Sequence, residues 1–131
     1  AVSCAGNHDN SIYNRWWSEQ HHGIKEIVAA SDTTFAYSIE TNPEIASRLK
    51  GHLLLVTGDV DNNVHPANTI RVVNALIKAN KRFAMLVLPG QSHSFGQMDE
   101  YFFWRMADYY CEWLLGDSRR SVVDISQINN R

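Results

Sequence analysis

The stretch that decides the fold is His52-Leu53-Leu54-Leu55-Val56-Thr57-Gly58. Its apolar side chains follow one another without alternation, which indicates a strand buried on both faces of a parallel sheet. Residues 66–80 are predicted to follow as a helix, and residues 83–88 as a second buried strand that ends at Pro89-Gly90. The apolar residues of the helix recur at helical spacing: Ile70, Val73, Leu76 and Ile77. A strand, a helix and a strand joined by short connections are typical of a parallel α/β sheet.

The sequence on either side of this unit extends the same layout. Residues 1–5 are small and apolar and are consistent with a further buried strand, whereas residues 6–23 are polar and aromatic-rich and predict a long loop with room for a short helix. A short helix is expected from Pro43 to about Lys50, with Asn42 as its candidate N-cap. A last helix is expected from about Asp99 to Leu115.

Length and composition limit the possible classes of protein. The chain has 131 residues, 44% of them hydrophobic and 20% charged, which is the composition of one globular domain. Its net charge of -2 argues against a partner with a nucleic-acid or anionic-membrane surface, and no apolar stretch approaches the ~20 residues of a membrane span. Cys4 and Cys111 are too few for a disulfide scaffold and are expected to be buried, reduced thiols.

Two loops leave the carboxyl ends of the predicted strands, where parallel sheets bind ligands. Asp61 lies in the first loop and His93 lies in the second, 32 residues later. This order of acid and histidine matches that of α/β-hydrolases. In their chemistry the histidine accepts the nucleophile's proton, and the carboxylate orients the ring and stabilises the imidazolium. The alternative for each residue alone is a turn-forming Asp and a solvated His.

Other sites in these loops are disfavoured. Asp59, Asp61 and Asn63 alternate as calcium ligands do, but Val64 stands where a calcium loop needs glycine, and Ile70 where it needs glutamate. Ser92 is a poor nucleophile candidate because Ser94 occupies the last glycine position of the G-x-S-x-G pattern. The pairs His8-Asp9 and His21-His22 lack the spacing of a zinc site, so no metal and no cofactor is expected.

The residues of the two loops resemble a known family. The first segment is Leu54-Leu55-Val56-Thr57-Gly58, followed by Asp61-Asn62-Asn63-Val64-His65. It is similar to the acid-loop motif L-L-x-H-G-x-x-D-[DN]-N-V-H of prolyl oligopeptidases, dipeptidyl peptidase IV branch. The second segment, Pro89 to His93, is similar to the Pro-x-x-x-His that lies downstream of that motif. The resemblance implies that Asp61 is the triad acid and His93 the triad base. It also implies that Asn63 binds a substrate carbonyl and that Val64 lines the pocket at the cleavage position.

Upstream of this motif the resemblance is looser. Tyr13 and Trp17 are similar to a pair of aromatic residues that wall the proline-sized pocket of dipeptidyl peptidases. The alternative is that they only pack a long loop onto the sheet. In the family the serine elbow precedes the strand expected at residues 1–5, by roughly 20 to 25 residues. Because the chain opens at Ala1 without a methionine, we expect a piece of a longer protein that lacks its nucleophile and does not hydrolyse peptides alone.

Together these observations predict a partial α/β-hydrolase fold, with the last strands of a parallel sheet and flanking helices. Residues 1–116 are expected to form the carboxy-terminal part of a peptidase catalytic domain, and residues 117–131 a polar tail. The implied partners are a peptide with Pro or Ala at the cleavage position, the missing amino-terminal parts of the protein, and a second copy in a homodimer. The compartment is left open. The alternatives are an esterase or acylaminoacyl peptidase of the same fold, or a non-enzymatic module.

Overall fold

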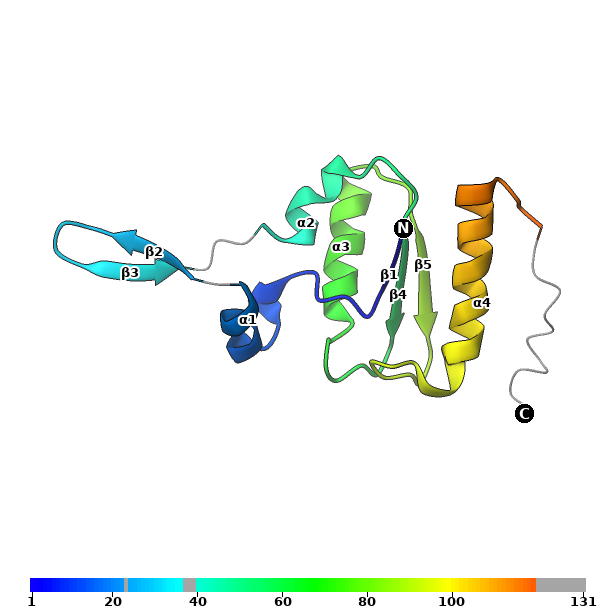
Figure 1. Cartoon of the computed structure of the whole chain (residues 1–131), viewed down its shortest axis with the longest axis horizontal. Helices are drawn as coiled ribbons and strands as arrows, with labels where there is room; N and C mark the ends of the chain where they lie inside the picture. The colour runs from blue at the N-terminus through cyan, green and yellow to red at the C-terminus, as the bar shows by residue number, and fades with distance from the viewer. Residues whose placement is uncertain (23, 37–39, 120–131) are drawn as a thin grey trace.

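A three-stranded parallel sheet forms the centre of the molecule. The computed structural model describes residues 1–22, 24–36 and 40–119. The sheet contains β1 (Val2–Cys4), β4 (Leu54–Gly58) and β5 (Ala84–Leu88) in the order β1-β4-β5 (Figure 1). Each strand runs parallel to its neighbour, with Val2 opposite Leu54 and Leu54 opposite Ala84. The predicted parallel α/β layout is confirmed.

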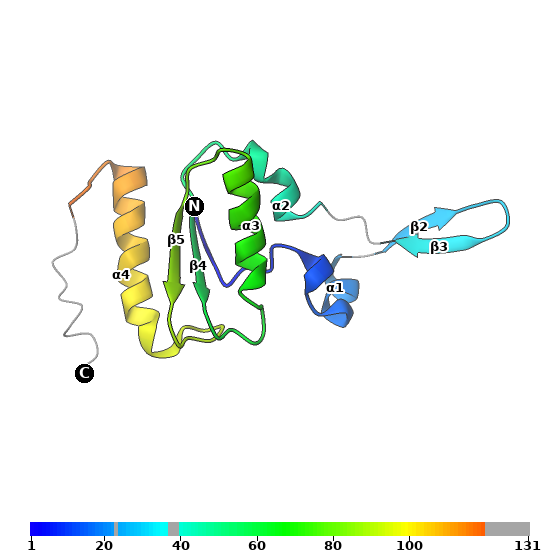
Figure 2. The same ribbon diagram turned by 180° about the vertical axis from the view of Figure 1, so that it is seen from behind.

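Helices cover both faces of this sheet. The helix α3 (Ala67–Lys78) packs on one face, on the same side as the short helices α1 (Arg15–His22) and α2 (Asn42–Ile45) (Figures 1 and 2). The helix α4 (Asp99–Tyr110) lies on the other face and continues through a π-helical turn, Cys111–Leu115. It ends at Gly116, whose φ of +70° is the left-handed conformation expected of a glycine C-cap.

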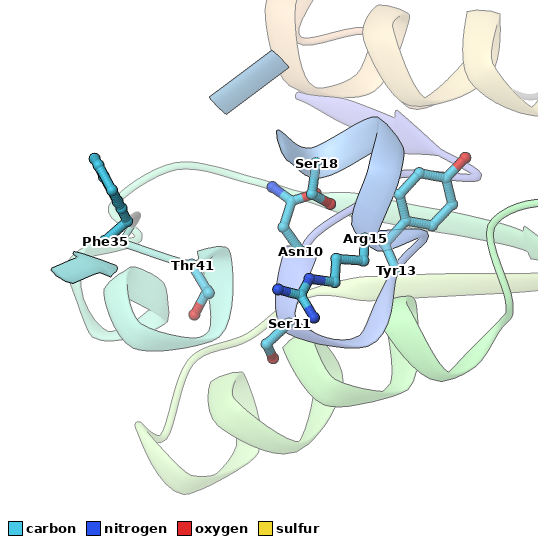
Figure 3. Close-up of a pocket in the computed structure, with 7 residues that line it drawn as sticks. All are labelled: Asn10, Ser11, Tyr13, Arg15, Ser18, Phe35 and Thr41. Carbon is cyan, nitrogen blue, oxygen red and sulfur yellow. The ribbon is translucent and has the colours of Figure 1, made fainter. Parts of the chain in front are cut away.

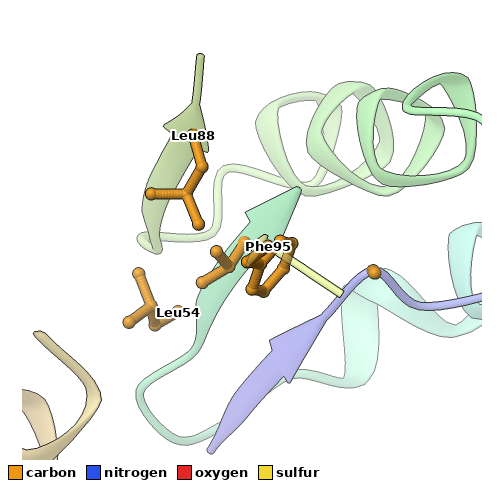
Figure 4. Packing of buried hydrophobic residues seen from close by; sticks show 5 residues of the cluster. Leu54, Leu88 and Phe95 are labelled. Carbon is orange, nitrogen blue, oxygen red and sulfur yellow. The ribbon is translucent and has the colours of Figure 1, made fainter. Parts of the chain in front are cut away.

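The central strand β4 supplies most of the core because both of its faces are covered. All five of its residues are buried. Leu54 and Val56 point to the α4 side, where they pack with Leu88 and Phe95 (Figure 4). Leu55 points to the α3 side and packs with the buried residues of that layer: Ala46, Val72 and Leu76. This two-sided burial is why the strand is a continuous apolar run.

Two sequence predictions about burial are wrong in detail. The sequence predicts that β5 is buried, but Val87 is exposed and only Leu88 is fully buried, because β5 is an outer strand of the sheet within the described residues. The buried face of α3 also differs from the apolar spacing. Ile70 and Ile77 are exposed, and the buried residues of the helix are Asn68, Thr69, Val72 and Leu76.

The short helices differ from their predicted limits. The loop expected over residues 6–23 contains a 3-10 turn, η1 (Asn10–Ile12), and the eight-residue helix α1. The helix expected from Pro43 to Lys50 is instead α2 followed by a 3-10 turn, η2 (Ala46–Arg48). Its N-cap is Thr41 rather than Asn42, and the Glu44 carboxylate accepts hydrogen bonds from the Thr41 amide and hydroxyl.

An antiparallel hairpin that the sequence analysis does not predict separates α1 from α2. It consists of β2 (Lys25–Val28) and β3 (Thr33–Ala36), and it extends away from the sheet (Figure 1). Nearly all of its side chains are exposed, including Ile27, Val28 and Phe35.

Three smaller expectations can be compared with the structure. Cys4 is exposed rather than buried, because it lies on a strand that is paired on one side within the described residues, and Cys111 is partly buried. The predicted polar tail lies outside the described residues beyond Arg119. No helix within the described ranges is both long and apolar enough to cross a membrane.

Gly58 provides a test of how the loops that follow β4 and β5 pack against each other. A Cβ at this position would lie 2.1 Å from the Gln91 carbonyl oxygen, a backbone atom that cannot swing aside. We therefore expect Gly58→Ala to lower the free energy of unfolding by about 1–3 kcal/mol or more. Gly51→Ala is the matched control because no atom lies within 4 Å of its added Cβ. Chemical denaturation of both variants measures the difference, and equal stabilities would contradict the packing described.

Candidate active site

The loops after β4 and β5 bring Asp61 and His93 into contact. The two strands are neighbours in the sheet, so both loops leave the same edge. His93 Nδ1 lies 2.9 Å from Asp61 Oδ2. The Asp61 side chain is completely buried, whereas that of His93 is 43% exposed. This pairing uses Nδ1 and leaves Nε2 as the ring nitrogen that can exchange a proton with a reacting group.

The second oxygen of Asp61 organises its own loop. Oδ1 accepts hydrogen bonds from the backbone amides of Asn63, at 2.9 Å, and of Val64, at 3.0 Å. Three hydrogen bonds thus compensate for burying the carboxylate. Because the amides of Asn63 and Val64 donate these hydrogen bonds, the residue that orients His93 also sets the backbone position of two predicted substrate-binding residues.

The His93 loop is packed tightly against the Asp61 loop. The Val60 amide donates to the Gln91 carbonyl oxygen at 3.2 Å, and Gly58 allows the backbone of Gln91 to approach. On the far side of His93, Phe95 is buried and packs edge-on against Phe102 with ring centroids 5.1 Å apart. Its φ of +57° is the left-handed conformation, which is strained for a bulky residue, so the buried ring holds this turn in place.

The aromatic residues predicted for the pocket reach the same loop. The Tyr13 hydroxyl donates a hydrogen bond to Asn63 Oδ1 at 2.9 Å. The Tyr13 ring packs edge-on against Trp17, with centroids 5.6 Å apart and planes 80° apart. The six residues singled out in the sequence therefore form one connected group: Asp61, His93, Asn63, Val64, Tyr13 and Trp17.

A polar network that the sequence analysis missed anchors Tyr13 to α3. The Arg71 guanidinium Nε lies 3.1 Å from Asp9 Oδ2, and the Asp9 amide donates to Asn68 Oδ1 at 3.0 Å. Asp9 Oδ1 also accepts from the Ser11 amide at 2.9 Å and so caps η1. In the sequence, Asp9 was examined only as a possible metal ligand next to His8. Its actual role depends on contacts between residues about sixty positions apart, for which no local motif exists.

His8 belongs to the same buried segment. Its Nδ1 lies 2.8 Å from the Asn42 side-chain nitrogen, and its carbonyl oxygen accepts from the Asn42 amide at 3.0 Å. Burial lowers the pKa of His8 below its ordinary value of 6.5, because the charged imidazolium loses its hydration.

Two cavities are formed by the described residues away from the Asp61–His93 pair, which lines neither of them. One, of about 500 Å³, lies beside Tyr13, and Figure 3 shows its lining of Asn10, Ser11, Tyr13, Arg15, Ser18, Phe35 and Thr41. The other, of about 340 Å³, lies between α2 and the sheet. In the part of the chain that the structure describes, no three His, Cys, Asp or Glu side chains are grouped to hold a metal ion.

Comparison with known proteins identifies the family to which the chain belongs. Residues 1–117 match the model of the prolyl oligopeptidase family. The chain belongs to the prolyl oligopeptidase family. It is similar to the crystal structure of Porphyromonas gingivalis dipeptidyl peptidase 4, with 26% identity and a TM-score of 0.65. That comparison covers 83% of this chain and 15% of the other.

A second solved structure shares the fold. It is the "putative dipeptidyl aminopeptidase IV" of Bacteroides ovatus, with 20% identity, a TM-score of 0.69 and coverage of 83% of this chain and 15% of that one. No curated protein sequence matches the chain. The predicted partial α/β-hydrolase fold is confirmed, and the chain spans about 15% of the length of the solved relatives.

The two members of the pair are expected to differ in their effect on stability. Asp61→Ala removes a buried carboxylate and leaves the amide of the buried Val64 without its acceptor, so it should lower the free energy of unfolding by about 2–4 kcal/mol. His93→Ala removes a half-exposed ring and should cost less than about 1 kcal/mol. Denaturant titration measures both variants. Equal losses would contradict the organising role of Asp61.

His8 is expected to make the fold sensitive to acid. Because its pKa is lower in the folded state than in the unfolded state, the unfolded state binds the proton first as the pH falls below about 6.5. Stability should then decrease by at most about 1.4 kcal/mol per pH unit from this residue. His8→Gln should flatten that part of the profile, whereas the exposed His52→Gln should not. An unchanged slope in His8→Gln would contradict this assignment.

Proposed function

We propose that this chain is the carboxy-terminal part of the catalytic domain of a serine peptidase of the dipeptidyl peptidase IV type. Asp61 and His93 are its triad acid and base, and the nucleophilic serine belongs to a part of the protein outside these residues. The hydrogen bond between His93 Nδ1 and Asp61 Oδ2, at the positions of the family's motif, is the observation that carries the proposal.

In this reaction His93 transfers protons at Nε2. It takes the proton from the serine hydroxyl as the serine oxygen attacks the peptide carbonyl, and it gives that proton to the departing amine. Water then attacks the carbonyl of the acyl-enzyme while His93 takes a proton from the water molecule. His93 returns that proton to the serine oxygen as the ester bond breaks, which frees the serine. Asp61 holds the ring by Nδ1 and stabilises the imidazolium. The exposure of His93 fits this role, because 43% of its side chain remains accessible to a reacting group.

The substrate side of the site is built from the other four residues. Tyr13 and Trp17 present aromatic surface, and an aromatic pair suits the flat, apolar ring of proline. Val64 would close the pocket from the Asp61 loop. The Tyr13 hydroxyl occupies Asn63 Oδ1, so the amide nitrogen of Asn63 is the group that can donate to a substrate carbonyl. The substrate that fits is a peptide with Pro or Ala at the cleavage position.

The partners of the chain are part of the same proposal. Within the described residues β1 pairs with β4 on one side, and we assign its other edge to the amino-terminal strands of the same protein. A second copy in a homodimer would pack on the apolar residues exposed along α4 and the turn that follows it: Phe103, Tyr110, Trp113, Leu114 and Leu115.

The proposal is tested in the full-length protein with a fluorogenic dipeptide substrate that has proline before the scissile bond. His93→Ala and Asp61→Asn should each lower kcat by about 10⁴-fold, because both prevent proton transfer through a correctly oriented ring. His52→Ala is the control, since His52 precedes β4 and so lies at the opposite end of the strand. Full activity of His93→Ala would contradict the proposal. Hydrolysis of simple esters alone would indicate an esterase, and no hydrolysis a non-enzymatic module.

Tyr13→Phe tests the pocket separately from the triad. The variant keeps the ring and removes only the hydroxyl that holds Asn63. Losing one neutral hydrogen bond should raise KM for the dipeptide substrate roughly 2- to 12-fold and change kcat less. Hydrolysis of a small ester that does not reach Asn63 should stay the same. An equal loss on both substrates would contradict this role of Tyr13.

A further inference from the structure

Asp59 makes a contact that the family motif does not assign. It is the first residue after β4, and the motif leaves its position free. Its Oδ1 accepts a hydrogen bond from the Gly90 amide at 2.6 Å. The contact joins residues 31 positions apart and connects the two loops that carry Asp61 and His93.

The Gly90 amide is available because of the turn in which it lies. The Gln91 amide donates to the Leu88 carbonyl oxygen at 3.3 Å, which closes a four-residue turn with Pro89 and Gly90 at its centre. Pro89 followed by a glycine with a φ of +69° is the residue pattern of a type II turn. The turn's own hydrogen bond does not use the amide of the third residue. An acceptor from outside the turn can therefore bind Gly90.

The contacts on either side place this hydrogen bond next to the catalytic pair. The Asp59 amide donates to the Leu88 carbonyl oxygen at 3.4 Å, and the Val60 amide donates to that of Gln91 at 3.2 Å. Asp61 follows Val60 directly, and His93 is two residues beyond Gln91. Catalytic groups must be held within about 0.5 Å of their productive geometry, so a larger displacement of either loop in this region would disturb the pairing of Asp61 with His93.

We propose that Asp59 is a positioning residue for the triad, whose carboxylate fastens the start of the His93 loop to the Asp61 loop. It acts through Gly90 and does not itself touch the substrate. This inference rests on the proposed function of Asp61 and His93. It adds a second acidic residue, beside Asp61, to those that determine the geometry of the base.

The first test is kinetic and uses the full-length protein. Asp59→Ala should lower kcat/KM for the dipeptide substrate by about tenfold or more, mainly through kcat, because the base is displaced while the pocket is unchanged. Asp59→Asn should stay within about threefold of the wild type, because its amide oxygen can accept the same hydrogen bond. Asp32→Ala, on the exposed hairpin, is the matched control. Unchanged kcat/KM in Asp59→Ala, or an equal loss in Asp59→Asn, would overturn the proposal.

The second test separates this proposal from the proposed function. Hydrogen exchange of the Gly90 amide and the proton resonance of His93 Nδ1–H can be followed whether or not the protein hydrolyses peptides. In Asp59→Ala, exchange at Gly90 should become faster and the Nδ1–H resonance should broaden or shift, and Asp59→Asn should restore both. If the wild type is inactive but these signals respond, only the proposed function fails. If the protein is active and the signals do not respond, the positioning role of Asp59 fails.

Discussion

The site depends on one buried carboxylate. Asp61 has no exposed side-chain surface, and it is stable there because each oxygen has a defined partner. Oδ2 binds the ring of His93, and Oδ1 binds the amides of Asn63 and Val64. A single group therefore sets the orientation of His93, the proposed base, and the backbone position of Asn63 and Val64, the proposed substrate-binding residues.

The fold brings the Asp61 loop and the His93 loop together at one edge of the sheet. The strands β4 and β5 are parallel neighbours, so their loops leave the sheet side by side. Gly58 lets the two loops touch at backbone distance, and Phe95 fastens the far end of the His93 loop in the core. The aromatic side of the site is held by different means. The ion pair between Asp9 and Arg71 ties the segment before Tyr13 to α3, which starts from the Asp61 loop itself.

The sequence predicts the parts of this arrangement that depend on local patterns. The continuous apolar run of β4, the glycine at the end of α4 and the order of Asp61 and His93 all follow from residue type and spacing. The spacing of apolar residues does not predict which side of α3 is buried. Asn68 is buried and Ile70 is exposed, because Asn68 accepts a hydrogen bond from the amide of Asp9, 59 positions away in the sequence. The sequence does not predict the hydrogen bond of Asp59 either, because it joins two loops that are far apart in the chain. The hairpin after α1 is not predicted because it buries little surface and so has no apolar periodicity.

The most direct measurement is a crystal structure of the full-length protein after reaction with a phosphonylating inhibitor of serine hydrolases. The account predicts a phosphonylated serine whose Oγ lies roughly 3 Å from His93 Nε2, with His93 Nδ1 still on Asp61 Oδ2. It also predicts that Tyr13 and Trp17 border the space beside the phosphorus atom. A modified residue elsewhere in the protein, or a His93 ring that faces away from the modified serine, would contradict the account.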